Sequence, residues 1–432
     1  MTQSFLSDLL TRVAAVGRVI SPSADRTPLA DLCHALVTGR GEATSLALAR
    51  TILDRIKRLD AAEKKAFLLE LQNRFGPDPK AVEKALAAYR DAPNGVALRA
   101  LNRATEPVSQ ELIRRLNRAP GGTADLVALR ADLLTMLKDA PELEALDADF
   151  RHLFTSWFNR GFLELRQIDW STSAEVLEKI IAYEAVHEIR GWEDLRRRVA
   201  APDRRLYAFF HPALRGDPLI FVEVALTAAI PGAIGGILAE ERPHMAPEDA
   251  TTAVFYSISN CQEGLRGISF GNFLIKQVVE ELRREFETLT TFVTLSPVPG
   301  LRRWAESAAA KKDGGLTPAQ KTLVANLATG AGTPTDPALA GLAARYLTDP
   351  DDSAGRVARD PVARFHLGNG ARLERIHLGA DDSPRGMSAS WGVMVNYLYD
   401  LATIERNHEA FATRGEIIAS PAVQKLARAG AK

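Results

Sequence analysis

The chain has 432 residues, of which 46% are hydrophobic and 25% charged, the composition of a globular protein with about two domains. Lys plus Arg and Asp plus Glu are equal at 54 each, so no net charge favours nucleic acid or an anionic membrane as a partner. Two cysteines exclude a disulfide framework and a cysteine-rich metal site, and they fit a reducing compartment. No apolar run reaches the roughly 18 residues that span a bilayer. We therefore expect a protein that binds neither nucleic acid nor membrane.

The N-terminal stretch MTQSFLSDLLTRVAAVG is predicted to form an amphipathic helix. Asp8 and Arg12 interrupt the apolar run that a secretory signal requires, and a transit peptide would be free of acidic residues. A cytoplasmic location is therefore expected.

Residues 1–187 are predicted to be helical throughout. Segments such as 42–59 and 60–75 place apolar residues at i, i+3, i+4 and i+7, the period of an amphipathic helix. Breakers such as Pro93-Asn94-Gly95 separate these segments. No fixed repeat period is present, so a helical bundle is expected rather than a solenoid.

Strands and helices are mixed after about Gly191. The segments RLYAFFHP and PLIFVEVALT flank ALRGD, which predicts a hairpin. Further strands are predicted at 252–259, 290–298, 371–379 and 390–399, with helices at 269–286 and around PVARFHLG, and a helical insertion near 303–350. These elements predict an α/β domain with a mixed central sheet over 188–432, so the whole chain is of the α+β, multi-domain class.

The junction between the strand at 252–259 and the next helix carries the first candidate site. The first turn of a helix leaves N–H groups without intrahelical partners, and these groups favour an anion such as phosphate. Gly267 and Gly271 would allow a ligand to approach the backbone closely. The same glycines also suit a turn that only packs tightly, and the local sequence leaves both interpretations open.

Arg266-x-x-Ser269-x-Gly271 resembles the (Gln/Arg)-x-x-Gly-x-(Gly/Ala) element of the N-acetyltransferase (GNAT) superfold, whose loop binds the pyrophosphate of coenzyme A. Ser269 stands where a glycine is usual. A wider match is more specific. In this order, FHPALRGDPLIFVEVALT, FYSISNCQEGLRGISFGNFLIKQVVEELRREF, TLSPVPGLRRW, DPVARFHLGNGARLERIHLGAD and SWGVMVNYLYD resemble the malonyl-CoA decarboxylase family.

The resemblance implies a GNAT-like catalytic domain over 188–432 and a helical domain over 1–187 that mediates oligomerisation. A homo-oligomer, either a dimer or a tetramer, is therefore expected. The implied reaction converts malonyl-CoA to acetyl-CoA and CO₂ through a thioester enolate that is then protonated. The thioester is itself an adequate electron sink, so no metal, biotin or pyridoxal phosphate is expected. The residues expected to bind CoA are Arg266, Gly267, Ile268, Ser269, Phe270, Gly271 and Asn272.

Three residues are implied to be catalytic. Ser296, in TLSPVPG, would hydrogen-bond the malonyl carboxylate or relay a proton, although a serine before proline also suits a simple turn. His366, in VARFHLGNG, would protonate the enolate carbon with an imidazole of pKa near 6.5, although it also suits a helix C-terminus. Tyr399 would orient His366 or Ser296, although a strand-end tyrosine in the core is an equal alternative. Ser296 and His366 are also expected to contact substrate.

Two other functions stay open at this point. A GNAT-type N-acyltransferase would transfer an acyl group from acyl-CoA to an amine and would need an acceptor groove. A non-catalytic CoA-binding or scaffold protein would need no residue at position 366 in particular. No chemistry is assigned to His211 or His377, and Arg302 and Arg303 are interpreted as a solvated pair.

Overall fold

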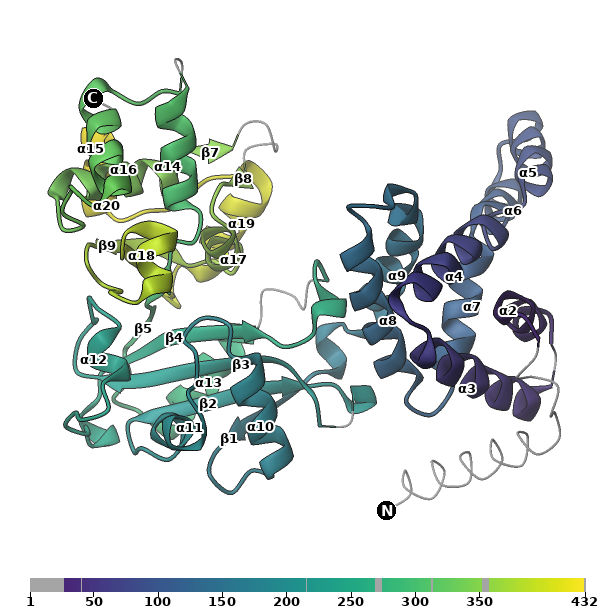
Figure 1. Cartoon of the computed structure of the whole chain (residues 1–432), viewed down its shortest axis with the longest axis horizontal. Helices are drawn as coiled ribbons and strands as arrows, with labels where there is room; N and C mark the ends of the chain where they lie inside the picture. The colour runs from purple at the N-terminus through teal and green to yellow at the C-terminus, as the bar shows by residue number, and fades with distance from the viewer. Residues whose placement is uncertain are drawn as a thin grey trace. The chain divides into compact units, whose positions relative to one another are not determined.

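The structure is a computed structural model, and it describes residues 27–39, 41–214, 216–268, 274–311, 314–351 and 357–430 (Figure 1). The chain divides into two compact units. Unit 1 contains Met1–Glu164, His211–Asp217 and Gln262–Phe270, and unit 2 contains Leu165–Phe210, Pro218–Cys261 and Gly271–Lys432. Within the described residues, no helix combines the length and the apolarity that a bilayer crossing needs.

Unit 1 is helical, as the periodicity predicts. Its α-helices are α2 (Leu29–Thr38), α3 (Glu42–Arg58), α4 (Ala61–Arg74), α5 (Pro79–Asp91), α6 (Gly95–Thr105), α7 (Val108–Asn117), α8 (Gly122–Met136) and α9 (Glu144–Trp157). Asp60 and Glu63 begin α4 with a reciprocal capping box. Arg130 of α8 is buried, pairs with Asp147 at 2.8 Å and donates to the carbonyl of Gly264 at 2.7 Å. This contact holds the segment 262–268 against α8.

The helices α5 and α6 differ from the rest of unit 1. They form an antiparallel pair in which no residue is buried. Val96 is 70% exposed and Leu98 is 43% exposed. An amphipathic helix in a soluble fold normally covers its apolar face, so this pair presents an apolar surface that the rest of the described chain does not cover.

Unit 2 is built on a mixed sheet with the strand order β1-β2-β3-β4-β5-β10-β6, and β9 also pairs with β10. The strands are β1 (Glu164–Ile168), β2 (Arg204–Phe210), β3 (Pro218–Thr227), β4 (Thr252–Asn260), β5 (Thr291–Thr294), β6 (Ser296–Pro297), β9 (Arg372–His377) and β10 (Met394–Leu398). β2 and β3 form the predicted hairpin. β4 and β5 are parallel, whereas β5 and β10 are antiparallel. The predicted mixed-sheet class is confirmed.

Two details of the sequence interpretation are wrong. The segment 164–168 is a strand in a region predicted to be all helical, because its short, mostly exposed pattern shows no clear period. The last predicted strand begins at Met394 rather than at residue 390, because Pro384–Ser390 forms the helix α18. Trp391 ends that helix in the left-handed conformation with φ 53°, and Gly392 follows with φ 77°.

Helices surround the sheet and fill the insertion. Those that follow the first strand are α10 (Ala174–Tyr183), α11 (Trp192–Val199), α12 (Gly235–Leu238) and α13 (Leu274–Glu285). The insertion is helical as predicted, with α14 (Leu301–Ala310), α15 (Pro318–Thr329) and α16 (Pro337–Thr348). The C-terminal part adds α17 (Pro361–Gly368), α19 (Ile404–Arg414) and α20 (Pro421–Gly430), and β7 (Pro350–Asp351) pairs with β8 (Val357–Ala358). α20 packs on α16, so the last described helix lies against the insertion (Figure 1).

The pairing of β4 with β5 ends partway along both strands. Their register runs from Thr252 opposite Thr291 to Phe255 opposite Thr294. Beyond that point β4 shifts register against β3 next to Glu223, and Ser296 pairs with Val395 of β10 instead. Two parallel strands that separate in this way leave room between them for a ligand.

Candidate active site

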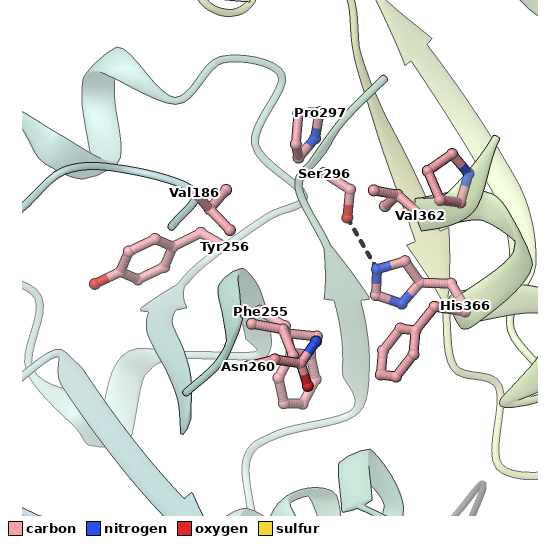
Figure 2. Close-up of a pocket in the computed structure, with 11 residues that line it drawn as sticks. Val186, Phe255, Tyr256, Asn260, Ser296, Pro297, Val362 and His366 are labelled. Carbon is pink, nitrogen blue, oxygen red and sulfur yellow. Dashed lines mark hydrogen bonds between the residues drawn. The ribbon is translucent and has the colours of Figure 1, made fainter. Parts of the chain in front are cut away.

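A cavity of about 270 Å³ lies in unit 2 where β4 and β5 separate (Figure 2). Its lining is largely apolar and includes Val186, Phe255, Ile258, Pro297, Pro361, Val362 and Phe365. The polar lining residues are Asn260, Ser296 and His366, together with Tyr256, whose hydroxyl points away from the other three (Figure 2). The cavity is therefore a mostly apolar slot in which Ser296 and His366 lie side by side, apart from Asn260 and Tyr256 (Figure 2).

Ser296 and His366 face one another in this cavity. Ser296 begins β6, His366 lies in the last turn of α17, and their side chains point together (Figure 2). Ser296 Oγ is 3.2 Å from His366 Nε2, and both residues are buried. The fold thus brings together two predicted site residues that are 70 positions apart in the sequence.

Two tyrosines of the β10 segment hold the imidazole. The Tyr399 hydroxyl lies 2.7 Å from His366 Nδ1, which is the partnership expected for Tyr399. The Tyr397 ring stacks on the imidazole with centroids 4.7 Å apart and an interplanar angle of 24°. Sequence reasoning did not find Tyr397, because stacking between distant residues leaves no local pattern. With both nitrogens hydrogen-bonded and one face covered, the ring has little rotational freedom.

Burial changes the expected acidity of His366. The surrounding protein removes water from the ring, and this desolvation lowers the pKa of His366 from 6.5 to about 3. The expectation of an ordinary pKa near 6.5 is therefore wrong for the free protein, in which the imidazole is neutral at neutral pH. An anion bound beside the ring would offset the desolvation and favour the protonated form.

Thr294 completes the hydrogen-bond chain at Ser296. The Ser296 hydroxyl donates to Thr294 Oγ1 at 2.8 Å, and the backbone N–H of Tyr397 donates to the same oxygen at 3.1 Å. Thr294 is fully buried at the end of β5. The sequence analysis missed it, although a hydroxyl residue two positions before a candidate serine on a strand is a usable signal, because such positions share a face.

Asp360 connects the histidine helix to the serine segment. Its Oδ1 accepts the N–H groups of Val362 and Ala363 and so caps α17. Its Oδ2 accepts from Tyr346 Oη at 3.2 Å and from the Gly300 N–H at 3.4 Å. Burial raises the pKa of Asp360, and the backbone hydrogen bonds oppose that rise. The pair Asp360-Pro361 is a recognisable helix start in the sequence. The contacts of Asp360 with Tyr346 and Gly300 become visible only in the folded structure.

The predicted phosphate-binding loop lies only partly within the described residues. Gly267 has φ +80°, a left-handed conformation that favours glycine. The N–H groups of Arg266 and Ile268 donate to the carbonyls of Glu263 and Leu265, so they are already used within the turn. The remaining predicted CoA-binding residues, Ser269, Phe270, Gly271 and Asn272, lie outside the described residues, and their role stays a prediction.

Other polar residues that the sequence analysis considered have structural partners. Arg302 pairs with Glu306 at 2.8 Å and also lies over the Trp391 ring. His377 bonds Asn396, which in turn donates to the Thr294 carbonyl at 2.8 Å. In the part of the chain that the structure describes, no group of three or more His, Cys, Asp or Glu side chains is placed to hold a metal ion.

Comparison with known proteins gives consistent matches over most of the chain. Residues 75–158 match the family model of the malonyl-CoA decarboxylase N-terminal domain, and residues 161–432 match that of its C-terminal domain. A mitochondrial malonyl-CoA decarboxylase of Anser anser anser is 36% identical over 407 residues, which cover 84% of this chain and 80% of that protein. The one of Rattus norvegicus is 35% identical over 409 residues, which cover 85% and 82%.

Two solved structures are similar along nearly the whole chain. The crystal structure of malonyl-CoA decarboxylase from Rhodopseudomonas palustris has a TM-score of 0.87 at 51% identity, and the match covers 93% of this chain and 99% of that one. The structure from Agrobacterium vitis has a TM-score of 0.87 at 54% identity with the same coverage.

Proposed function

This chain belongs to the malonyl-CoA decarboxylase family, and from that premise we propose that it converts malonyl-CoA to acetyl-CoA and CO₂. The observation that carries the proposal is the hydrogen-bonded Ser296–His366 pair at one end of an apolar cavity. A CoA thioester threaded between β4 and β5 would bring its acyl end to this pair.

The proposed reaction has three chemical events. The bond between the carboxylate carbon and the α-carbon breaks, its electron pair moves onto the thioester as an enolate, and the α-carbon then takes one proton. With a thioester in the cavity, the apolar side chains of Val186, Val362 and Phe365 would leave the carboxylate few water contacts, and this favours loss of the localised charge as CO₂. In the free protein the Ser296 hydroxyl donates to Thr294; a bound substrate that turns this hydroxyl away from Thr294 would gain a donor for its carboxylate or developing enolate oxygen.

His366 is assigned the protonation of carbon. In the free protein its imidazole is neutral because burial lowers its pKa to about 3. Malonyl-CoA brings a carboxylate into the same cavity, and this negative charge favours uptake of a proton by the ring. The imidazolium then gives that proton to the enolate carbon and returns to its neutral form, so each turnover consumes one proton from solvent.

A direct assay tests the function against its alternatives. The purified protein is incubated with malonyl-CoA, and CO₂ and acetyl-CoA are measured with and without an added amine. We expect stoichiometric CO₂ and acetyl-CoA that do not depend on the amine. Amine-dependent release of free CoA would instead support an N-acyltransferase. No turnover by folded protein that binds CoA would support a non-catalytic role.

The proposal extends to assembly, cofactors and location. We expect a homo-oligomer formed through the helical region, because α5 and α6 expose an apolar face that includes Val96 and Leu98. No cofactor is proposed, since the thioester accepts the electron pair of the breaking bond. The cytoplasmic location expected from the sequence stays a prediction, and the relatives from Anser anser anser and Rattus norvegicus are named mitochondrial.

A further inference from the structure

Resting on the proposed function, we propose that Thr294 is a positioning residue that orients the Ser296 hydroxyl and thereby sets which nitrogen of His366 carries the proton. The three residues form one continuous hydrogen-bond chain that ends at Tyr399. The direction of that chain decides what His366 presents to the cavity.

The direction is fixed at the threonine end. Thr294 Oγ1 accepts the backbone N–H of Tyr397, which belongs to β10 and cannot rotate away. The same oxygen accepts the Ser296 hydroxyl proton at 2.8 Å. Ser296 has one hydroxyl proton, so toward His366 Nε2 at 3.2 Å its oxygen acts as the acceptor. Nε2 must therefore carry the imidazole proton.

The contact at Tyr399, the other end of the hydrogen-bond chain, agrees with this direction of donation. Tyr399 is buried, and burial raises the pKa of its phenol well above the usual value, so the phenol keeps its proton. With Nε2 protonated, Nδ1 is an acceptor, and the Tyr399 hydroxyl at 2.7 Å donates to it. Tyr399, His366, Ser296 and Thr294 thus donate in sequence, each to the next.

Removal of the Thr294 hydroxyl would allow the direction of donation along the hydrogen-bond chain to reverse. The Ser296 proton would then turn toward Nε2, and the imidazole proton would move to Nδ1 and point at Tyr399. Nε2 would then accept the Ser296 proton, and it would have to take up a proton before it could protonate carbon, whereas Nε2 of the original protein already carries one. The partner that fixes a histidine tautomer commonly controls the function of the ring.

The first test reads the tautomer directly. Protein labelled with ¹⁵N-histidine is examined by NMR at neutral pH, and the His366 signals are assigned by their loss in His366→Asn. We expect the Nε2–H form in the wild type and in Thr294→Ser, which keeps the hydroxyl. In Thr294→Val, which has the same shape without the hydroxyl, we expect a substantial Nδ1–H population. If Thr294→Val does not fold, Thr294→Ala removes the same oxygen and is measured in the same way.

The second test is kinetic. With malonyl-CoA we expect Thr294→Val to lower kcat by about 10–10²-fold and KM to change by less than about twofold, while Thr294→Ser stays within about threefold of wild type. The Nδ1–H form in the wild type, or an unchanged Nε2–H form in Thr294→Val, would overturn the proposal. Because the NMR measurement needs no turnover, a wild type with the Nε2–H form but no decarboxylation would count against the proposed function while supporting the orientation by Thr294.

Discussion

Two of the buried ionisable centres in the described part of unit 2, His366 and Arg198, have opposite kinds of partner. At His366 the hydrogen-bonding partners are the neutral hydroxyls of Ser296 and Tyr399, and the ring itself is neutral. At Arg198 on α11, the guanidinium lies 3.4 Å from both carboxylate oxygens of the fully buried Glu223 and 3.2 Å from Asp194. One centre is left without a counter-charge, whereas the other is complete within the protein.

The difference separates a functional site from a structural one. A buried charge with its partner in place stabilises a particular arrangement of elements and has no need of a ligand. A buried base without an opposite charge is poised to respond when a ligand brings one. The contrast predicts that changes at His366 act mainly on turnover, and that changes at Arg198 act mainly on folding.

The largest expected effect is on catalysis at the uncompensated centre. We expect His366→Asn to lower kcat for malonyl-CoA by about 10²–10⁴-fold with little change in KM, because a proton donor to carbon is lost. Ser296→Ala should also lower kcat, and the double variant should be barely worse than His366→Asn, because the two residues act as one unit. His244→Asn, at an imidazole that is 56% exposed, is the matched control. Near-wild-type turnover in either single variant would remove that residue from the mechanism.

At the compensated centre the effect should appear in stability. Burial raises the pKa of Glu223 to about 8, so Arg198→Ala leaves a protonated Glu223 and the buried carbonyl of His187 without their donor, which costs on the order of 3–5 kcal/mol in the free energy of unfolding. Arg197→Ala, at the partly exposed neighbour that also pairs with Asp194, should cost at most about 1 kcal/mol. Urea denaturation of both variants measures the difference. Equal stability of the two variants would show that the buried pair contributes nothing particular to the fold.

Asp360 should affect both stability and turnover, because its carboxylate caps α17 and also bonds the Gly300 N–H after the serine segment. Asp360→Ala should lower stability by about 1–2 kcal/mol through the lost cap. It should also lower kcat by about 10–10²-fold, because the link to Gly300 disappears. Asp336→Ala removes the cap of α16 alone, so it should cost a similar stability and no activity. Equal kcat values in the two variants would contradict a positioning role for Asp360.

A further prediction concerns how stability depends on pH, with a change that is small near neutral pH and grows in acid. The pKa of His366 is about 3 when folded and near 6.5 when unfolded, so between these values the unfolded chain binds more protons. This residue therefore makes the protein less stable as the pH falls from 6.5 toward 3, by up to about 1.4 kcal/mol per pH unit. The stability of His366→Asn should fall less steeply over this window in denaturation curves. Parallel pH profiles of the variant and the wild type would contradict a neutral buried imidazole.

Part of this architecture could be predicted from the sequence. Long amphipathic segments predicted the helices of unit 1, short apolar segments bounded by turn residues predicted the strands of unit 2, and the resemblance to the malonyl-CoA decarboxylase family implied Ser296 and His366. The strand at 164–168 was missed because five mostly exposed residues show no period. Thr294, Tyr397 and Asp360 were missed because each acts through contacts between distant segments, as when Asp360 bonds Gly300. The low pKa of His366 depends on burial, which follows only from the assembled fold.

Gly300 shows how the site and the insertion constrain one another's evolution. Its φ of −98° suits any residue, so the backbone does not require glycine there. A Cβ at this position would lie 2.1 Å from Tyr346 Oη and 3.6 Å from Asp360 Oδ2. We expect glycine at 300 to persist among descendants for as long as tyrosine occupies 346. A lineage that loses the phenol oxygen becomes free to accept alanine after the serine segment, so the two positions should change together.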